Sequence, residues 1–164
     1  MKLTDLNDVL VHELKDLYSA EKQLVEALPK VAKAAKNPRL RTAIEDHLEV
    51  TKEQLERLEK IGTSLGKKLT GHTCEGMKGL IKESDGLIEE NEPGDALDAA
   101  LIAAAQRVEH YEIAAYGSAV AFAKELGRDE TARLLQRTLE EEAEADEKLS
   151  AIAESTINEK AVTA

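Results

Sequence analysis

The sequence contains very few aromatic residues, a single cysteine, and little proline or glycine. Of its 164 residues, three are tyrosine and one is phenylalanine, and tryptophan is absent. Strands favour aromatic and β-branched side chains, whereas the Ala, Leu, Glu and Lys that dominate here favour helix. Cys74 cannot form an internal disulfide, so nothing indicates an oxidising compartment. We therefore expect a compact all-helical protein.

Basic charge and long apolar runs are also scarce. Lys and Arg number 22 against 33 Asp and Glu, which gives a formal net charge of −11. This balance would repel the phosphates of nucleic acid and anionic membrane surfaces, so neither is an expected partner. No apolar run approaches the ~20 residues that span a membrane, and no secretory leader is recognisable. We expect a cytoplasmic protein with one domain over residues 1–164.

Four long helical segments are indicated by the apolar spacing and by the turn residues between them. Their expected ranges are about 5–36, 38–65 and 95–126, with the fourth following Gly127. Thr4 is the expected N-cap of the first segment, and Asn37 that of the second, with proline in the first helical position. Gly66 and Gly127 are expected to stop the second and third segments.

The connections between these segments are unequal in length. Short turns join the first segment to the second and the third to the fourth, so each pair forms an antiparallel hairpin. Between the hairpins lies a crossover from about Gly66 to Gly94, with apolar residues spaced for a short amphipathic helix. Two hairpins with one long crossover are the connectivity of ferritin-like bundles. The sequence therefore predicts an all-α, ferritin-like four-helix bundle with a short extra helix.

Carboxylates interrupt the apolar faces of these segments. Glu21 lies between Leu17 and Leu24 in a row of leucines, and Glu109 and Glu112 share the inner face of the third segment. An unpaired carboxylate inside a bundle costs several kcal/mol, or its pKa rises until it is neutral. Several carboxylates at one depth are best explained by a cation among them.

The heights of these residues can be compared, because residues equally far from a hairpin turn lie side by side. Glu112 precedes Gly127 by 15 residues and Glu142 follows it by 15. Glu109 precedes the same glycine by 18, and Asp146 follows it by 19. The second hairpin therefore brings four carboxylates to a similar height.

The first hairpin places polar residues at a matching distance from its own turn. Glu21 precedes Asn37 by 16 residues, and Gln54 follows it by 17. If the hairpins pack with an approximate twofold, these residues join the same layer, which would suit iron, manganese or magnesium. Bridging carboxylates could hold two metals about 3.5–4 Å apart. Each glutamate could instead be a boundary residue whose carboxylate reaches water.

Histidine and tyrosine contribute less certain candidates. His47 faces inward, but its position along the second segment puts it roughly 6–9 Å from the layer. It could be a metal ligand or a core histidine bonded to a carboxylate. Tyr18 and Tyr116, one turn from glutamates of the layer, could donate hydrogen bonds or simply pack in the core. The other three histidines are not expected to be ligands: His12, His72 and His110.

Several segments together resemble the YciE/YciF family of ferritin-like proteins. They are Leu17-Tyr18-Ser19-Ala20-Glu21, His47-Leu48-Glu49, Cys74-Glu75-Gly76-Met77, Ala103 to Glu112 with its Val-Glu-His-Tyr-Glu run, Ala115-Tyr116-Gly117 and Thr138 to Glu142. The resemblance covers nearly the whole chain. It implies a bacterial, stress-associated cytoplasmic homodimer, related to rubrerythrins and di-iron carboxylate proteins.

The sequence departs from the usual di-iron pattern, which takes a Glu-x-x-His motif from each of two helices. Here the layer reads Thr51-x-x-Gln54 in the second segment, and Asp146 stands where the fourth might offer histidine. A single cysteine excludes a four-thiolate rubredoxin centre, so redox turnover would need an external reductant. The expected metal ligands are Glu21, Glu109, Glu112, Glu142, Asp146, His47 and Gln54.

Two functions remain open from the sequence. The first is a metal-carboxylate protein that binds iron or manganese and reacts with O2 or peroxide during stress. Magnesium and a mononuclear site are also compatible with the ligands, and no catalytic residue or organic cofactor is indicated. The second is a non-enzymatic helical stress or interaction protein with a vestigial site.

Overall fold

The computed structural model describes residues 2–162, which are helical over most of their length. Its six α-helices and one π-helical turn are α1 (Leu6–Ala34), α2 (Pro38–Ser64), α3 (Glu75–Glu90), α4 (Asp95–Glu125), α5 (Asp129–Ile152), η1 (Ala153–Ile157) and α6 (Asn158–Val162). The four predicted long segments are confirmed as α1, α2, α4 and α5, and the predicted ends differ from the observed ones by no more than two residues. The short turn η1 and helix α6 were not predicted.

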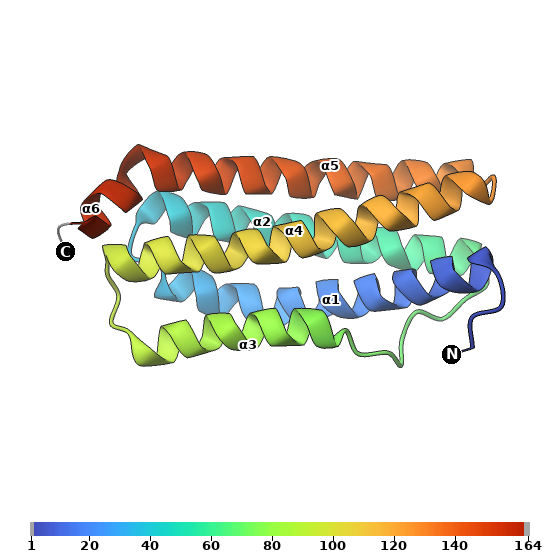
Figure 1. Ribbon diagram of the computed structural model, residues 1–164, viewed down its shortest axis with the longest axis horizontal. Helices are drawn as coiled ribbons and strands as arrows, with labels where there is room; N and C mark the ends of the chain where they lie inside the picture. The colour runs from blue at the N-terminus through green and yellow to red at the C-terminus, as the bar shows by residue number, and fades with distance from the viewer. Residues whose placement is uncertain (1, 163–164) are drawn as a thin grey trace.

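The four long helices run along the long axis of the molecule as two antiparallel hairpins (Figure 1). Each helix of one hairpin packs on one helix of the other: α1 contacts α4, and α2 contacts α5. Helix α3 lies outside this bundle against α1 and α4. The predicted four-helix bundle with an extra crossover helix is confirmed.

The crossover is long because α2 ends and α4 begins at opposite ends of the bundle (Figure 1). The chain must therefore return along the whole length of the bundle, and α3 is part of that return. Cys74 caps this helix, since its Sγ accepts a hydrogen bond from the Met77 amide. Gly66 and Gly127 have positive φ angles of 64° and 65°, as expected for glycines that end a helix.

The helix starts follow the expected capping chemistry with one correction. Asn37 caps α2 as predicted, because its Oδ1 accepts from the amides of Arg39 and Leu40. Thr4 does not cap α1, since Asp5 accepts from the Asp8 amide instead. The Thr4 hydroxyl and amide both donate to the Asp8 carboxylate. The threonine thus satisfies an acid of the first turn, and the N-cap moves one residue along.

Two apolar clusters occupy the two halves of the bundle core. One contains Leu17 of α1 and Leu135 of α5, and the other contains Ile44 of α2 and Leu149 of α5. The buried polar residues lie between them along each helix. On α5, for example, Glu142 is halfway between Leu135 and Leu149. The fold therefore encloses a polar layer between the two apolar clusters, and this layer contains the candidate site.

None of the helices in the described part of the chain combines the length and apolar character that a membrane-spanning segment needs.

Candidate metal centre

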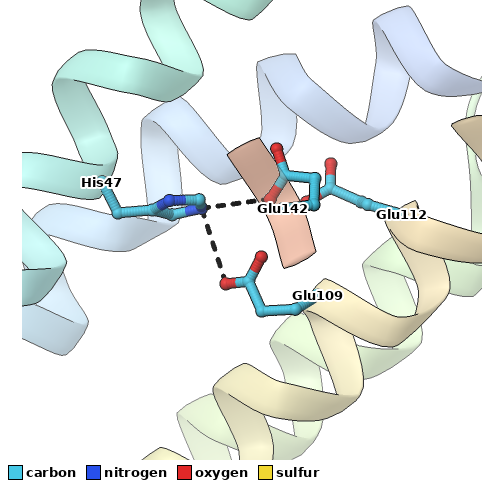
Figure 2. A group of neighbouring side chains, drawn as sticks. All are labelled: His47, Glu109, Glu112 and Glu142. Atoms are coloured by element: carbon cyan, nitrogen blue, oxygen red, sulfur yellow. Dashed lines mark ion pairs between the residues drawn. The ribbon is translucent and has the colours of Figure 1, made fainter. Parts of the chain in front are cut away.

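Three glutamates and one histidine meet in the polar layer. Glu109 and Glu112 come from α4, Glu142 from α5 and His47 from α2, and their side chains point toward one another (Figure 2). One nitrogen or carboxylate oxygen of each lies within 4.8 Å of those of the other three. Among residues 2–162 no other group of three or more His, Cys, Asp or Glu side chains meets this criterion.

His47 belongs to this group, although its position along α2 predicted a separation of several ångströms. Its Nε2 lies 3.5 Å from Glu109 Oε1 and 3.7 Å from Glu142 Oε2. The expected distance was counted along the helix from the hairpin turn, whereas the observed contacts join the tip of the imidazole to carboxylate oxygens. The expected separation from the layer is therefore wrong for the ring, and nothing in the spacing of residues indicated where the ring would point.

Glu21 and Gln54 flank the group from the first hairpin. Both side chains are fully buried. Glu21 Oε1 accepts a hydrogen bond from the Tyr116 hydroxyl, and Gln54 Nε2 donates to Glu142 Oε1. Gln54 Nε2 also donates to Glu141 Oε2 over 3.2 Å. Each of the two residues keeps one oxygen without a hydrogen-bond partner, Glu21 Oε2 and Gln54 Oε1.

Asp146 is not brought into the group. Its Oδ1 accepts from Gln106 Nε2 at 3.0 Å, and its Oδ2 lies 3.3 Å from the Nε2 of exposed His110. Four residues of helix turn the side-chain direction by about 40° relative to Glu142, because a turn takes 3.6 residues. This rotation carries Asp146 to the outer side of the α4–α5 contact.

The other polar residues of the predicted layer have partners elsewhere. The Thr51 hydroxyl donates to the backbone carbonyl of His47 at 2.9 Å. Tyr18 donates to Glu59 rather than to Glu21, whereas Tyr116 makes the contact with Glu21 described above. Of the two tyrosines considered, only Tyr116 therefore orients a carboxylate of the layer.

The polar layer is poor in hydrogen-bond partners. Eight buried side-chain nitrogen or oxygen atoms in residues 2–162 have none, and all but Arg128 Nε belong to this layer. The seven are Glu21 Oε2, His47 Nε2, Gln54 Oε1, Glu109 Oε2, both oxygens of Glu112 and Glu142 Oε2. Buried polar atoms in folded proteins are normally paired, and each unpaired one costs about 1–3 kcal/mol. Their concentration at one point requires a chemical explanation.

Asp98 shows how the same fold treats a buried carboxylate that serves structure alone. It is as deeply buried as Glu112 and lies on the same helix. Its two oxygens accept hydrogen bonds from the backbone amides of Lys36 and Asn37, each at 2.8 Å. Asp98 thereby ties the turn of the first hairpin to the start of α4. Glu112 has no comparable donors.

The electrostatics of the layer oppose ionised carboxylates in the metal-free protein. Burial raises the pKa of Glu112 well above its usual range, and the neighbouring carboxylates Glu21, Glu142 and Glu109 raise it further. Burial is also the main cause of the raised pKa of Glu21, with a contribution from Glu142. The pKa of Glu109 rises in the same direction, again mainly through burial.

The buried cation Arg57 does not neutralise the layer. Arg57 is buried on α2, and its guanidinium bonds both oxygens of Glu141 at 2.9 and 3.1 Å. Burial raises the pKa of Glu141, but the hydrogen bonds from Arg57, Arg137 and Gln54, together with the charge of Arg57, outweigh this and lower it. The arginine charge is therefore matched by Glu141.

These donors fit a metal ion. Carboxylate oxygens with one imidazole nitrogen suit iron, manganese and similar divalent ions. The unpaired atoms are the ones that a metal would engage, and it would remove the repulsion between the acids. Cys74 offers no thiolate to the group, since its Sγ lies 3.0 Å from the Tyr111 hydroxyl and caps α3.

Comparison with known proteins places the chain in a family. Residues 5–162 match the family model described as "Domain of unknown function (DUF892)". The protein YciF of Escherichia coli (strain K12) is 46% identical over 162 residues, which cover 98% of both chains. The chain belongs to the DUF892 family. The predicted resemblance to YciE/YciF proteins is thus confirmed.

Solved structures share the fold of this DUF892 protein. The crystal structure of the E. coli stress protein YciF is 46% identical with a TM-score of 0.92, covering 96% of this chain and 100% of that one. YcfI of Rhodopseudomonas palustris is 44% identical with a TM-score of 0.87, covering 91% and 95%. A protein of Xanthomonas campestris, 22% identical with a TM-score of 0.75 and coverage of 93% and 94%, shares the fold.

Proposed function

We propose that this protein binds iron or manganese in the bundle core and that the bound metal reacts with O2 or peroxide during stress. The observation that carries this proposal is the set of seven unpartnered buried atoms in one layer. Both oxygens of Asp98 accept hydrogen bonds, whereas neither oxygen of Glu112 has a hydrogen-bond partner. Burial of Glu112 therefore costs free energy that a bound cation would offset.

Four side chains are the proposed ligands: His47, Glu109, Glu112 and Glu142. Glu21 adds a fourth buried carboxylate beside them, with a free oxygen. If all four carboxylates are ionised, two divalent ions would neutralise them, which favours a binuclear centre. Magnesium suits the layer less well, because it dehydrates reluctantly and prefers oxygen ligands with several waters.

The surrounding residues fix the ligands and shield the two ends of the layer from water. Gln54 holds Glu142 through one oxygen, and Tyr116 holds Glu21 in the same way. Each of these hydrogen bonds engages one carboxylate oxygen and leaves the other oxygen available for further contacts. The two apolar clusters exclude bulk water from the ends of the layer, along the bundle axis. Bound iron or manganese would supply a redox-active ion with open positions for a small oxidant.

The biological setting follows from the family. The crystallised E. coli relative is described as a stress protein, and we extend that role to this chain. We also propose a cytoplasmic homodimer that receives electrons from an external reductant, since one cysteine cannot build a thiolate electron-transfer centre.

Metal titration tests the proposal. Protein freed of metal by a chelator is titrated with Fe(II) without oxygen, with Mn(II) and with Mg(II), and uptake is followed by calorimetry and elemental analysis. We expect saturable binding of Fe(II) or Mn(II) that Glu142→Gln weakens by roughly 10-fold or more, a loss typical of metal-site substitutions. Glu147→Gln, an exposed position on the same helix, is the matched control.

Two results would reject the metal site. One is the absence of saturable binding of both ions by the wild-type protein. The other is equal binding by Glu142→Gln and the control. Either would favour the alternative, a helical stress or interaction protein whose carboxylates are protonated. Metal binding without oxidation of Fe(II) by O2 or peroxide would reject the proposed reactivity alone.

A further inference from the structure

A pocket opens beside the candidate metal centre, between α2, α4 and α5, and has a volume of about 210 Å3. We call it the side pocket. Its walls are mainly apolar, with Ala43 and Val50 on α2, Ala105 on α4 and Leu149 on α5. His47 and Glu109 also line it. The side pocket therefore connects the protein surface to two proposed metal ligands.

The hollow region continues on the other side of these two residues. A second, smaller cavity of about 40 Å3 extends toward α1 and α3. The side pocket and this cavity share five lining residues, Leu28, Ile44, His47, Ala105 and Glu109. Ala105 is small and lies one helical turn before Glu109, so its lack of side-chain volume contributes to the open space beside the glutamate.

Size and lining indicate an organic occupant. An apolar cavity of about 150 Å3 holds one benzene molecule, so the side pocket has room for a ring or a short chain with a substituent. Water would find few polar partners along walls of alanine, valine and leucine. An apolar molecular body gains free energy by leaving water for such a surface.

The charged residues that line the side pocket argue against an anionic ligand. The exposed rim carries Asp46, Glu144 and Lys148, and Glu141 and Glu109 lie further in. Lys148 is the one basic residue in the lining, and its Nζ lies 3.3 Å from Asp46. A carboxylate or phosphate would meet more negative charge than positive.

The inner end selects for a hydrogen-bond donor without charge. A carboxyl oxygen of Glu109 accepts hydrogen bonds whether or not the group is protonated, and the His47 ring lines the same end. An ammonium group would lose its hydration on entering the apolar walls, whereas a hydroxyl loses far less. A hydroxyl therefore suits both the walls and the inner end.

We propose that the side pocket binds a small neutral organic molecule that carries one hydroxyl group, a phenol or a short-chain alcohol, with the hydroxyl toward Glu109 and His47. Binding needs only the protein. A role of this molecule as a substrate or reductant of the metal centre rests on the proposed function.

Binding of four probes tests this proposal: p-cresol, 1-hexanol, toluene and benzoate. Calorimetry is recorded with metal-free and Mn(II)-treated protein, and amide NMR spectra are recorded with the metal-free protein, because paramagnetic Mn(II) would broaden the signals near the site. We expect p-cresol or 1-hexanol to bind saturably and to shift the amide signals of Ala43, Val50 and Ala105. Toluene should bind more weakly because it lacks the hydroxyl, and benzoate should not shift these signals. Binding of p-cresol alone assigns a phenol, and binding of 1-hexanol alone an alcohol.

Variants locate the binding. Ala105→Leu should weaken binding by roughly 10-fold or more, because its side chain occupies the pocket. Ala103→Leu, on the exposed side of the same helix, should leave binding unchanged. If circular dichroism shows that Ala105→Leu does not fold, Ala145→Leu fills the pocket from α5 instead.

Three results would overturn the proposal: no saturable binding of either hydroxyl compound, equal affinity for toluene, or unchanged binding in a folded pocket-filling variant. The outcome is independent of the metal test. Binding of p-cresol by protein that takes up no metal would keep the pocket and reject the proposed function. Metal uptake without organic binding would reject the side-pocket proposal alone.

Discussion

Replacing Glu112 by glutamine changes the charge of the buried layer while nearly preserving its shape. Both Glu112 oxygens lack hydrogen-bond partners, and its side chain is fully buried. In the metal-free protein this carboxylate must either stay charged among other acids or take up a proton. In the metal-bound protein it would be a ligand. The same substitution should therefore have opposite effects in the two forms.

The expected size follows from the cost of protonation. At pH 7 a carboxyl with an ordinary pKa of 4.5 is ionised in the unfolded chain. Burial and neighbouring carboxylates raise the pKa of Glu112 in the folded protein. Holding a proton about 2.5 pH units above the ordinary pKa costs about 3.5 kcal/mol at about 1.4 kcal/mol per unit. This value is the upper limit, because the protein adopts the cheaper of the two charge states.

Glutamine needs no proton, so Glu112→Gln should stabilise the metal-free protein by up to about 3.5 kcal/mol at pH 7. For a chain of this size this corresponds to a rise in Tm of roughly 7–14 °C. The gain should vanish near pH 4, where the unfolded chain is protonated as well. With metal present at about 1,000 times its Kd the order reverses, because binding then stabilises the wild type by about 4.1 kcal/mol.

Urea unfolding followed by circular dichroism measures both effects, with EDTA in one series and Mn(II) in the other. Glu125→Gln, an exposed position of the same helix, is the control and should change neither series by more than about 0.5 kcal/mol. A metal-free Glu112→Gln protein that is less stable than the wild type by 1 kcal/mol or more would refute the reasoning. So would a variant that retains the full stabilisation by Mn(II).

Three further predictions follow from the same layer and its surroundings. The raised pKa values of Glu21, Glu109 and Glu112 mean that the protonated forms of these residues favour folding. The stability of the metal-free protein should therefore be highest near pH 4.5 and fall as the pH rises. An EDTA-treated protein whose Tm rises from pH 5 to pH 8 would contradict this. Tyr116→Phe removes the donor to Glu21 and should cost about 1–3 kcal/mol in urea unfolding without metal; no loss would show that this bond does not stabilise the fold. Gly76→Ala should cost about 1–3 kcal/mol, because its Cβ would lie 2.8 Å from the Tyr111 ring, and an unchanged Tm would mean that the ring moves aside freely.

The sequence was sufficient for the architecture of this protein. Helix ends could be predicted because Asn37, Gly66 and Gly127 act locally, through a cap or through a positive φ angle. The crossover could be predicted from its length, because a chain that must return along the bundle needs more residues than a turn provides. Inward positions of Glu21 and Glu112 followed from helical periodicity, which depends on neighbours three and four residues away.

Tertiary structure alone decided which side chains meet. The inclusion of His47 and the exclusion of Asp146 depend on how far a side chain reaches across the bundle and on the rotation of α5 about its axis. Neither quantity is encoded by spacing within one helix, because both arise from packing between helices. The side pocket has the same origin. In the sequence Ala105 is an ordinary helix-forming residue. The space left by its small side chain becomes part of a pocket only because α2 and α5 are positioned around it.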